Sequence, residues 1–125
     1  MITKIEKIQA IGNFEDYVAV GDVTLKEFNL IYAENGAGKT TLTSIFRSLS
    51  SGETSLILKR KRVKTLMPQI VSIKDTSCQF QYNSNQWNQL KPDIEIFDTF
   101  FVNENIYSGF DINNEHKKKL HQFIL

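Results

Sequence analysis

A short glycine-rich stretch between a predicted strand and a predicted helix constrains this chain more than any other feature. The mostly apolar run FNLIY at residues 28–32 leads into AENGAGKTT, which begins at Ala33. A glycine loop that opens a helix gathers backbone N–H groups at the positive end of that helix, an arrangement that binds phosphate. The residues after the loop have the spacing of one apolar helix face: Leu42, Ile45, Phe46 and Leu49.

The residue types within the loop fit a nucleoside triphosphate and its metal ion. Glycines let the backbone turn tightly around the phosphates, where a side chain would intrude. The ammonium of Lys39 would reach the β- and γ-phosphates of ATP, the hydroxyl of Thr40 would bind Mg²⁺, and Thr41 would contact the α-phosphate. The predicted nucleotide-binding residues are Asn35, Gly36, Ala37, Gly38, Lys39, Thr40 and Thr41.

The loop departs from the phosphate-binding pattern G-x-x-x-x-G-K-[ST] at one position. Ala33 stands where the pattern has its first glycine. That glycine starts the loop at the strand end, and one methyl group is tolerated there if φ stays negative. We therefore predict a nucleotide loop, against the alternative of a strand–helix turn that happens to carry Gly-Lys-Thr.

Two segments resemble the start of the ATPase head that SMC-type proteins share with ABC-type relatives. They are KIQAIGNFEDY and FNLIYAENGAGKTTL. In that superfamily an opening strand carries an Asn-Phe motif and the loop reads roughly G-x-N-G-x-G-K-[ST], which Asn13, Phe14 and Asn35 match. The segment from Ile94 to the end is similar to AAA-type bacterial ATPases of the anticodon-nuclease and phage-defence kind.

From these patterns and this resemblance we expect an α/β fold, a P-loop NTPase half-domain with a mixed sheet. Antiparallel strands in residues 2–32 and 66–82 would join a parallel pair formed by the loop-bearing strand and IEIFD, residues 94–98. Gly12 and Asn13 predict a turn within the first of these ranges, and in the second Phe80 and Tyr82 alternate with glutamines, which is typical of a strand. One main helix would follow the phosphate loop. Residues 1–125 would be the N-terminal lobe of an ATPase head, and residues 113–125 would start a helix that leads to a further insertion.

A second motif, LSSGE at residues 49–53, has the letters of the signature with which paired lobes of this superfamily clamp ATP. Its position favours another interpretation. Leu49 belongs to the apolar face of the predicted helix, and Gly52 stands where a helix-ending glycine is expected. The C-terminal end of a helix carries the negative pole of its dipole and repels phosphate. We interpret LSSGE as a helix C-terminus.

Asp98 is the tentative catalytic residue and second Mg²⁺ ligand. In a compact P-loop enzyme it would hold Mg²⁺ through water. The resemblance instead places it at the Q-loop, where Asp98 or Asn103 would position Mg²⁺ or water; a solvent-facing strand end is the third reading. Because the chain carries no complete acid pair or signature, we expect it to bind ATP weakly and hydrolyse it poorly without a second head in a homodimer.

The residues alone are also compatible with two other functions. One is a self-contained small phosphotransferase that uses Asp98 for Mg²⁺. The other is a non-catalytic module that binds nucleic acid or a protein partner. A net charge of +1 gives no global argument for nucleic acid, so that argument depends on one basic run, which is otherwise a solvated loop. The run contains Lys59, Arg60, Lys61, Arg62 and Lys64.

Composition favours an ordinary intracellular protein. The single Cys78 excludes an internal disulfide and suits a reducing compartment. The N-terminus alternates polar and apolar residues and does not resemble a secretory signal. Since the apolar runs are also short, we expect a cytoplasmic protein without a membrane span.

Overall fold

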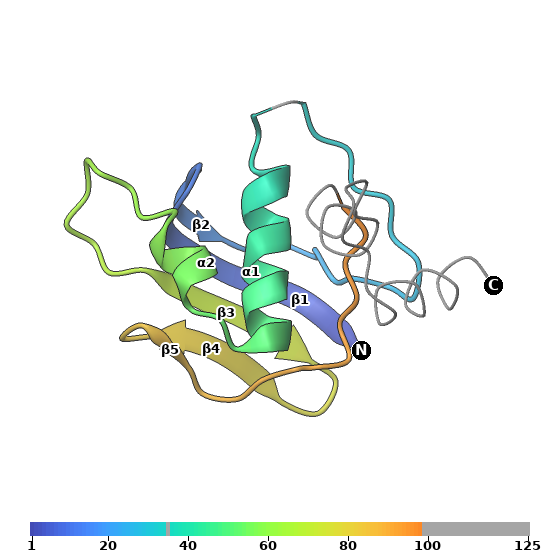
Figure 1. The fold of residues 1–125 in the computed structure, drawn as a ribbon. Coiled ribbons are helices and arrows are strands. Elements are labelled where there is room, and N and C mark those ends of the chain that lie inside the picture. Colours follow the sequence, from blue (N-terminus) through green and yellow to red (C-terminus); the bar gives the residue numbers. More distant parts are fainter. Residues whose placement is uncertain (35, 99–125) are drawn as a thin grey trace, which may run out of the picture. The chain divides into compact units, whose positions relative to one another are not determined.

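The computed structural model describes residues 1–34 and 36–98 (Figure 1). The chain divides after Ile94, and the parts on either side are described separately. The first part contains all the strands and helices of the described residues. They are β1 (Ile2–Ile11), β2 (Phe14–Val18), α1 (Lys39–Ser51), α2 (Ser55–Leu58), β3 (Ile70–Asp75), β4 (Gln79–Asn83) and β5 (Gln86–Trp87).

The five strands form one sheet in the order β2-β1-β3-β4-β5, and each neighbouring pair is antiparallel. The turn predicted at Gly12 and Asn13 is confirmed, because these two residues join β1 to β2. In β4 the side chains of Phe80 and Tyr82 are buried, and the glutamines that alternate with them are exposed. This alternation is typical of a sheet that buries one face.

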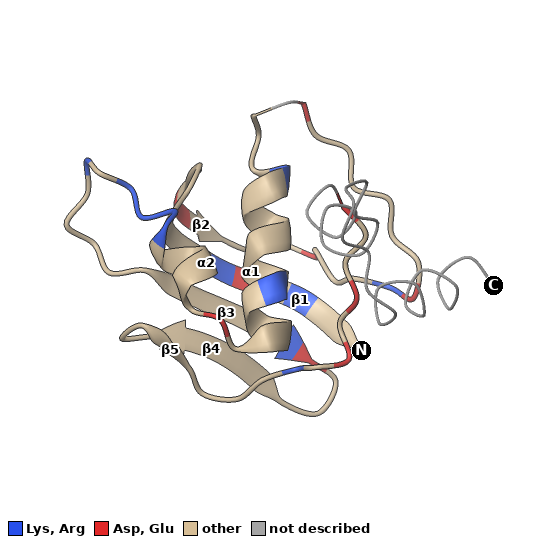
Figure 2. Ribbon diagram, in the orientation of Figure 1, with Lys and Arg blue, Asp and Glu red and all other residues tan. Residues whose placement is uncertain are grey.

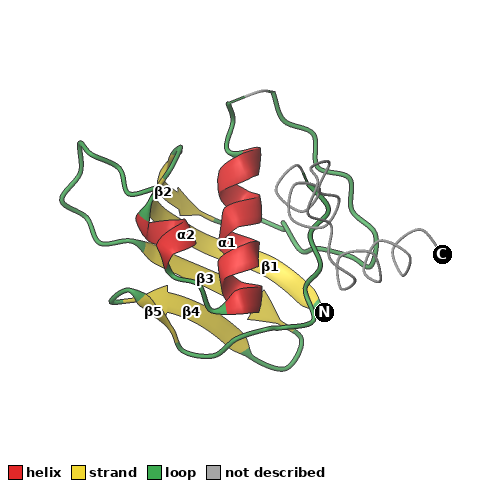
Figure 3. Ribbon diagram, viewed as in Figure 1, coloured by secondary structure: helices red, strands yellow, loops and turns green. Residues whose placement is uncertain are grey.

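Both helices cover the same face of the sheet (Figure 1 and Figure 3). The glycine stop predicted at Gly52 is confirmed: its φ is +81° and its N–H donates to the Ser48 carbonyl (2.8 Å). LSSGE is therefore the end of α1. The apolar residues of helices and strands meet in one core of Ile8, Ile11, Ile45, Leu49, Ile57, Val71, Ile73, Phe80 and Tyr82.

The expected fold class is wrong. The sheet contains no parallel pair among the described residues, and two short helices replace the expected single main helix. Residues 28–32 and 94–98, which we expected to pair, both lie outside the strands. A mostly apolar run such as FNLIY suits a strand buried on both faces, but here the helices cover one face of the sheet. Figure 3 shows the described residues between β2 and α1 as loop.

An ion-pair cluster joins the end of β3 to the segment that follows β5. Asp75 is 5% exposed, and its carboxylate lies 3.1 Å from the Lys91 ammonium and 3.3 Å from the α-amino group of Met1. The hydrogen bond from Lys91 lowers the pKa of Asp75 well below its usual value, and the same bond raises the pKa of Lys91. The backbone N–H of Lys91 also donates to the Leu49 carbonyl (3.1 Å), which ties this segment to the end of α1.

Candidate functional site

The glycine loop, residues 33–41 without Asn35, includes the first turn of α1, which begins at Lys39. Gly36 and Gly38 have φ values of +84° and +106°, which glycine adopts at low cost. Gly38 is the N-cap residue of α1; among the described residues no side chain caps this helix, and its first turn carries no acidic residue. Since the first N–H groups of a helix lack partners within the helix, this end presents positive potential to an anion.

The side chains at the start of α1 face different surroundings. Lys39 and Thr40 are exposed, whereas Thr41 is 4% exposed. The Lys39 ammonium folds back across the glycine loop and donates to the Ala33 carbonyl (2.7 Å). An ammonium has three N–H donors, so this contact leaves others for an anion at the loop. The predicted residues Gly36 to Thr41 thus lie together, and Asn35 lies outside the described residues.

The turn between β1 and β2 lies against the glycine loop. The Asn13 side-chain amide donates to the Gly36 carbonyl. A Cβ atom on Gly12 would be within 2.9 Å of Thr41 Cγ2, and one on Gly38 would be within 2.9 Å of the Phe14 ring. Each glycine is therefore required by close packing as well as by its positive φ. Gly12, Asn13 and Phe14 are thus the residues of the hairpin that lie against the glycine loop.

The basic segment, residues 59–64, forms hydrogen bonds with the same turn. The Gly12 N–H donates to the Arg60 carbonyl (2.6 Å), and Arg62 Nη1 donates to the Gly12 carbonyl (2.9 Å). Arg60 Nε donates to Ser44 Oγ of α1 (3.1 Å). Figure 2 shows the basic residues along the loop that follows α2. The two arginines are thus structural contacts, and the exposed cations of the segment are Lys59, Lys61 and Lys64.

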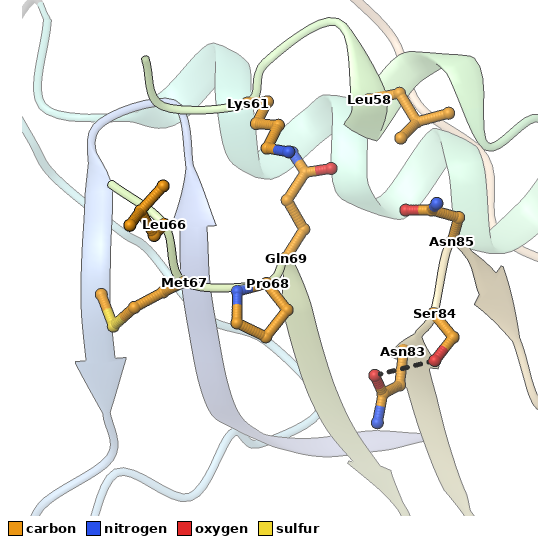
Figure 4. A pocket seen from close by; sticks show the side chains of 9 residues that line it. All are labelled: Leu58, Lys61, Leu66, Met67, Pro68, Gln69, Asn83, Ser84 and Asn85. Carbon is orange, nitrogen blue, oxygen red and sulfur yellow. Dashed lines mark hydrogen bonds between the residues drawn. The ribbon is translucent and has the colours of Figure 1, made fainter. Parts of the chain in front are cut away.

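A separate cavity of about 380 Å³ opens beside this segment (Figure 4), and no described residue of the glycine loop is among those that line it. Among the described residues that line it, Lys61 alone is charged, and Gln69 uses its amide to donate to the Ile57 carbonyl (2.8 Å). This lining includes no carboxylate, so it offers no acid–base pair. The lining residues are Leu58, Lys61, Leu66, Met67, Pro68, Gln69, Asn83, Ser84 and Asn85.

The tentative metal ligand Asp98 is half-buried in a bend at the end of the described residues. It belongs to the part of the chain after Ile94, so its distance from the glycine loop is not defined. Asn103 and the helix expected at residues 113–125 lie outside the described residues. Within the described ranges no three His, Cys, Asp or Glu side chains gather as a metal site.

Sequence reasoning missed the contacts by which the β1–β2 turn and the basic segment support the glycine loop. The roles of Gly12, Asn13 and Arg62 depend on residues 23 to 50 positions away, which local patterns do not reveal. The sequence predicts the turn itself at Gly12 and Asn13, and the Asn-Phe motif marks the same place, but neither signal predicts a contact with the glycine loop. The Asn-Phe motif is identified only by its resemblance to other ATPase heads, and that resemblance predicts no structural role for either residue.

In a comparison with known protein families, the AAA domain family matches residues 11–123. No curated protein and no solved structure matches the chain. Neither helix in the described ranges has the length and apolar character that crossing a membrane requires. The family match starts at the end of β1 and includes the turn, the glycine loop and the basic segment. The chain therefore belongs to the AAA domain family, a family of nucleotide-binding ATPase-like modules.

Proposed function

We propose that the chain binds the triphosphate of ATP at the glycine loop. The observation that carries the proposal is the start of α1, where Lys39 and Thr40 are exposed directly after the left-handed Gly38. Within the described part of the chain, no acidic or capping side chain competes for this end of α1. A cationic side chain beside uncompensated backbone N–H groups is the donor set that phosphate oxygens prefer.

The residues of the loop have different roles in this proposal. Lys39 would exchange its contact with the Ala33 carbonyl for phosphate oxygens, because a charged acceptor forms the stronger hydrogen bond. The exposed Thr40 hydroxyl would bind Mg²⁺, and bound Mg²⁺ would neutralise phosphate charge. The Thr41 side chain is packed against Gly12, so Thr41 would contact the α-phosphate through its backbone N–H. Asn35 completes the proposed set.

We also propose that hydrolysis needs a second ATPase unit, as in SMC- and ABC-type heads, and that this chain supplies the N-terminal lobe. The support is the apolar surface next to the loop. Phe28, Leu30 and Tyr32 are 88%, 98% and 88% exposed, which is unusual for large apolar residues so close together. A covering lobe would bury this surface and bring groups such as an acid pair to the phosphates; Asp98 stays a tentative contributor. A cytoplasmic location belongs to the same proposal.

Isothermal titration of Mg·ATP into the 125-residue chain tests the nucleotide site. Replacing Lys39 with alanine should weaken binding by at least about tenfold, since a hydrogen bond to a charged group contributes about 1.5–3 kcal/mol. Lys59→Ala is the matched control, because it removes the same charge from an exposed position of the basic segment. Equal affinities for the two variants would contradict the proposal.

We also propose that the basic segment contacts nucleic acid, but through fewer residues than the sequence predicted. Arg60 and Arg62 hold the β1–β2 turn and α1. The contact would therefore involve the exposed lysines of the loop, together with the exposed Val63. Those lysines are Lys59, Lys61 and Lys64.

A further inference from the structure

The peptide between Gly36 and Ala37 is engaged at both of its polar atoms. Its carbonyl accepts the hydrogen bond from the Asn13 amide, and its N–H donates to the Glu34 carbonyl (3.1 Å). The C=O and N–H of a trans peptide point in opposite directions. Holding both therefore fixes the orientation of this peptide, and with it the direction in which the loop enters α1.

Asn13 belongs to a turn that contacts with other segments hold in place. Gly12, its neighbour, exchanges two hydrogen bonds with the basic segment, through Arg60 and Arg62. On the other side, Phe14 packs under Gly38. A contact from a supported turn orders the loop more than a contact from a mobile segment would. Preorganisation of this kind raises affinity because less conformational freedom is lost when the ligand binds.

We propose that Asn13 is a positioning residue of the phosphate site: its amide holds the Gly36 carbonyl, so that the glycine loop is shaped for the triphosphate before ATP arrives. The inference rests on the proposed function for its effect on ATP. Its structural part, the ordering of the loop by Asn13, is independent of any ligand. Asn13 acts through the loop backbone and does not itself touch the phosphates.

Two variants of Asn13 separate this role from a role in the turn alone. Asparagine and aspartate are both favoured turn residues, so Asn13→Asp preserves the turn but removes the amide donor. It also places a carboxylate against the Gly36 carbonyl. Asn13→Ala removes the donor without adding charge. Asn29→Ala is the control, since the Asn29 side chain also bonds loop backbone, at Lys26, and no hydrogen bond joins it to the described residues of the glycine loop.

Titration with Mg·ATP gives the first readout. We expect Asn13→Ala to bind about tenfold more weakly than the parent chain, and Asn13→Asp to bind more weakly still. Asn29→Ala should bind like the parent. If Asn13→Asp binds as tightly as the parent chain, the amide contributes nothing beyond the turn and the inference is overturned.

Amide hydrogen exchange without nucleotide gives the second readout. Both Asn13 variants should exchange the Ala37 amide faster than the parent chain, while core amides of β3 keep their protection. Unchanged exchange at Ala37 would overturn the inference even if binding fell. If the parent chain binds no Mg·ATP but the Ala37 exchange responds as expected, the proposed function fails while the ordering of the loop by Asn13 stands.

Discussion

Replacing Gly12 with alanine tests the packing of the β1–β2 turn against α1. Gly12 has a φ of +54°, and alanine in the left-handed region costs about 1–2 kcal/mol. The added Cβ would also meet the Thr41 side chain, at 2.9 Å from Cγ2 and closer to Oγ1. Overpacking of this kind costs about 1–3 kcal/mol. The two effects predict a total loss of about 2–5 kcal/mol in the free energy of unfolding.

Gly21 provides a matched control. Its φ is +73°, and a Cβ there would meet nothing within 4 Å. Gly21→Ala should therefore show the backbone cost alone, about 1–2 kcal/mol. Urea denaturation followed by fluorescence of Trp87, the single tryptophan, measures both variants, because its indole is half-buried and donates to Ser48.

A double-mutant cycle with Thr41→Ala isolates the clash. Removing Oγ1 and Cγ2 of Thr41 leaves its Cβ 3.1 Å from the new methyl group, so most of the overpacking is relieved. We predict a coupling energy of about 1–3 kcal/mol between the two substitutions. Equal losses for Gly12→Ala and Gly21→Ala, together with zero coupling, would refute the reasoning.

Two further predictions concern charged groups. Asp75→Asn should lower the melting temperature at pH 7, because the depressed pKa of Asp75 gives stability that is present above 3.8, the pKa of an unperturbed aspartate, and lost as pH falls below it. The difference from the parent chain should therefore shrink as pH falls from about 4 to about 2, and a constant difference would contradict it. Neutralising the exposed lysines of the basic segment with glutamine should weaken binding of a single-stranded oligonucleotide and flatten its salt dependence. Unchanged affinity and salt slope would remove the nucleic-acid proposal.

Local signals predicted the features of this fold that depend on neighbouring residues. Gly12 and Asn13 mark a tight turn, alternation around Phe80 and Tyr82 marks a half-buried strand, and Gly52 marks a helix end. Each of these depends on backbone preference or on side-chain period, which a few residues define.

Pairing of distant segments could not be predicted in this way. The apolar run at residues 28–32 favours a buried parallel strand, but burial depends on what else covers it, and here its aromatic residues are exposed. The same limit applies to the candidate site. Its glycines, Lys39 and Thr40 can be found from their order along the chain, whereas the support from Asn13 and Arg62 arises from the fold.

Backbone amide NMR during titration with Mg·ATP tests the central claim most directly, because it locates the site residue by residue. Binding at the start of α1 predicts saturable shifts of the amide signals of Gly36 to Thr41, and their loss in Lys39→Ala. Shifts confined to the cavity beside the basic segment, at Gln69 and Asn83 to Asn85, would contradict a phosphate site at the glycine loop.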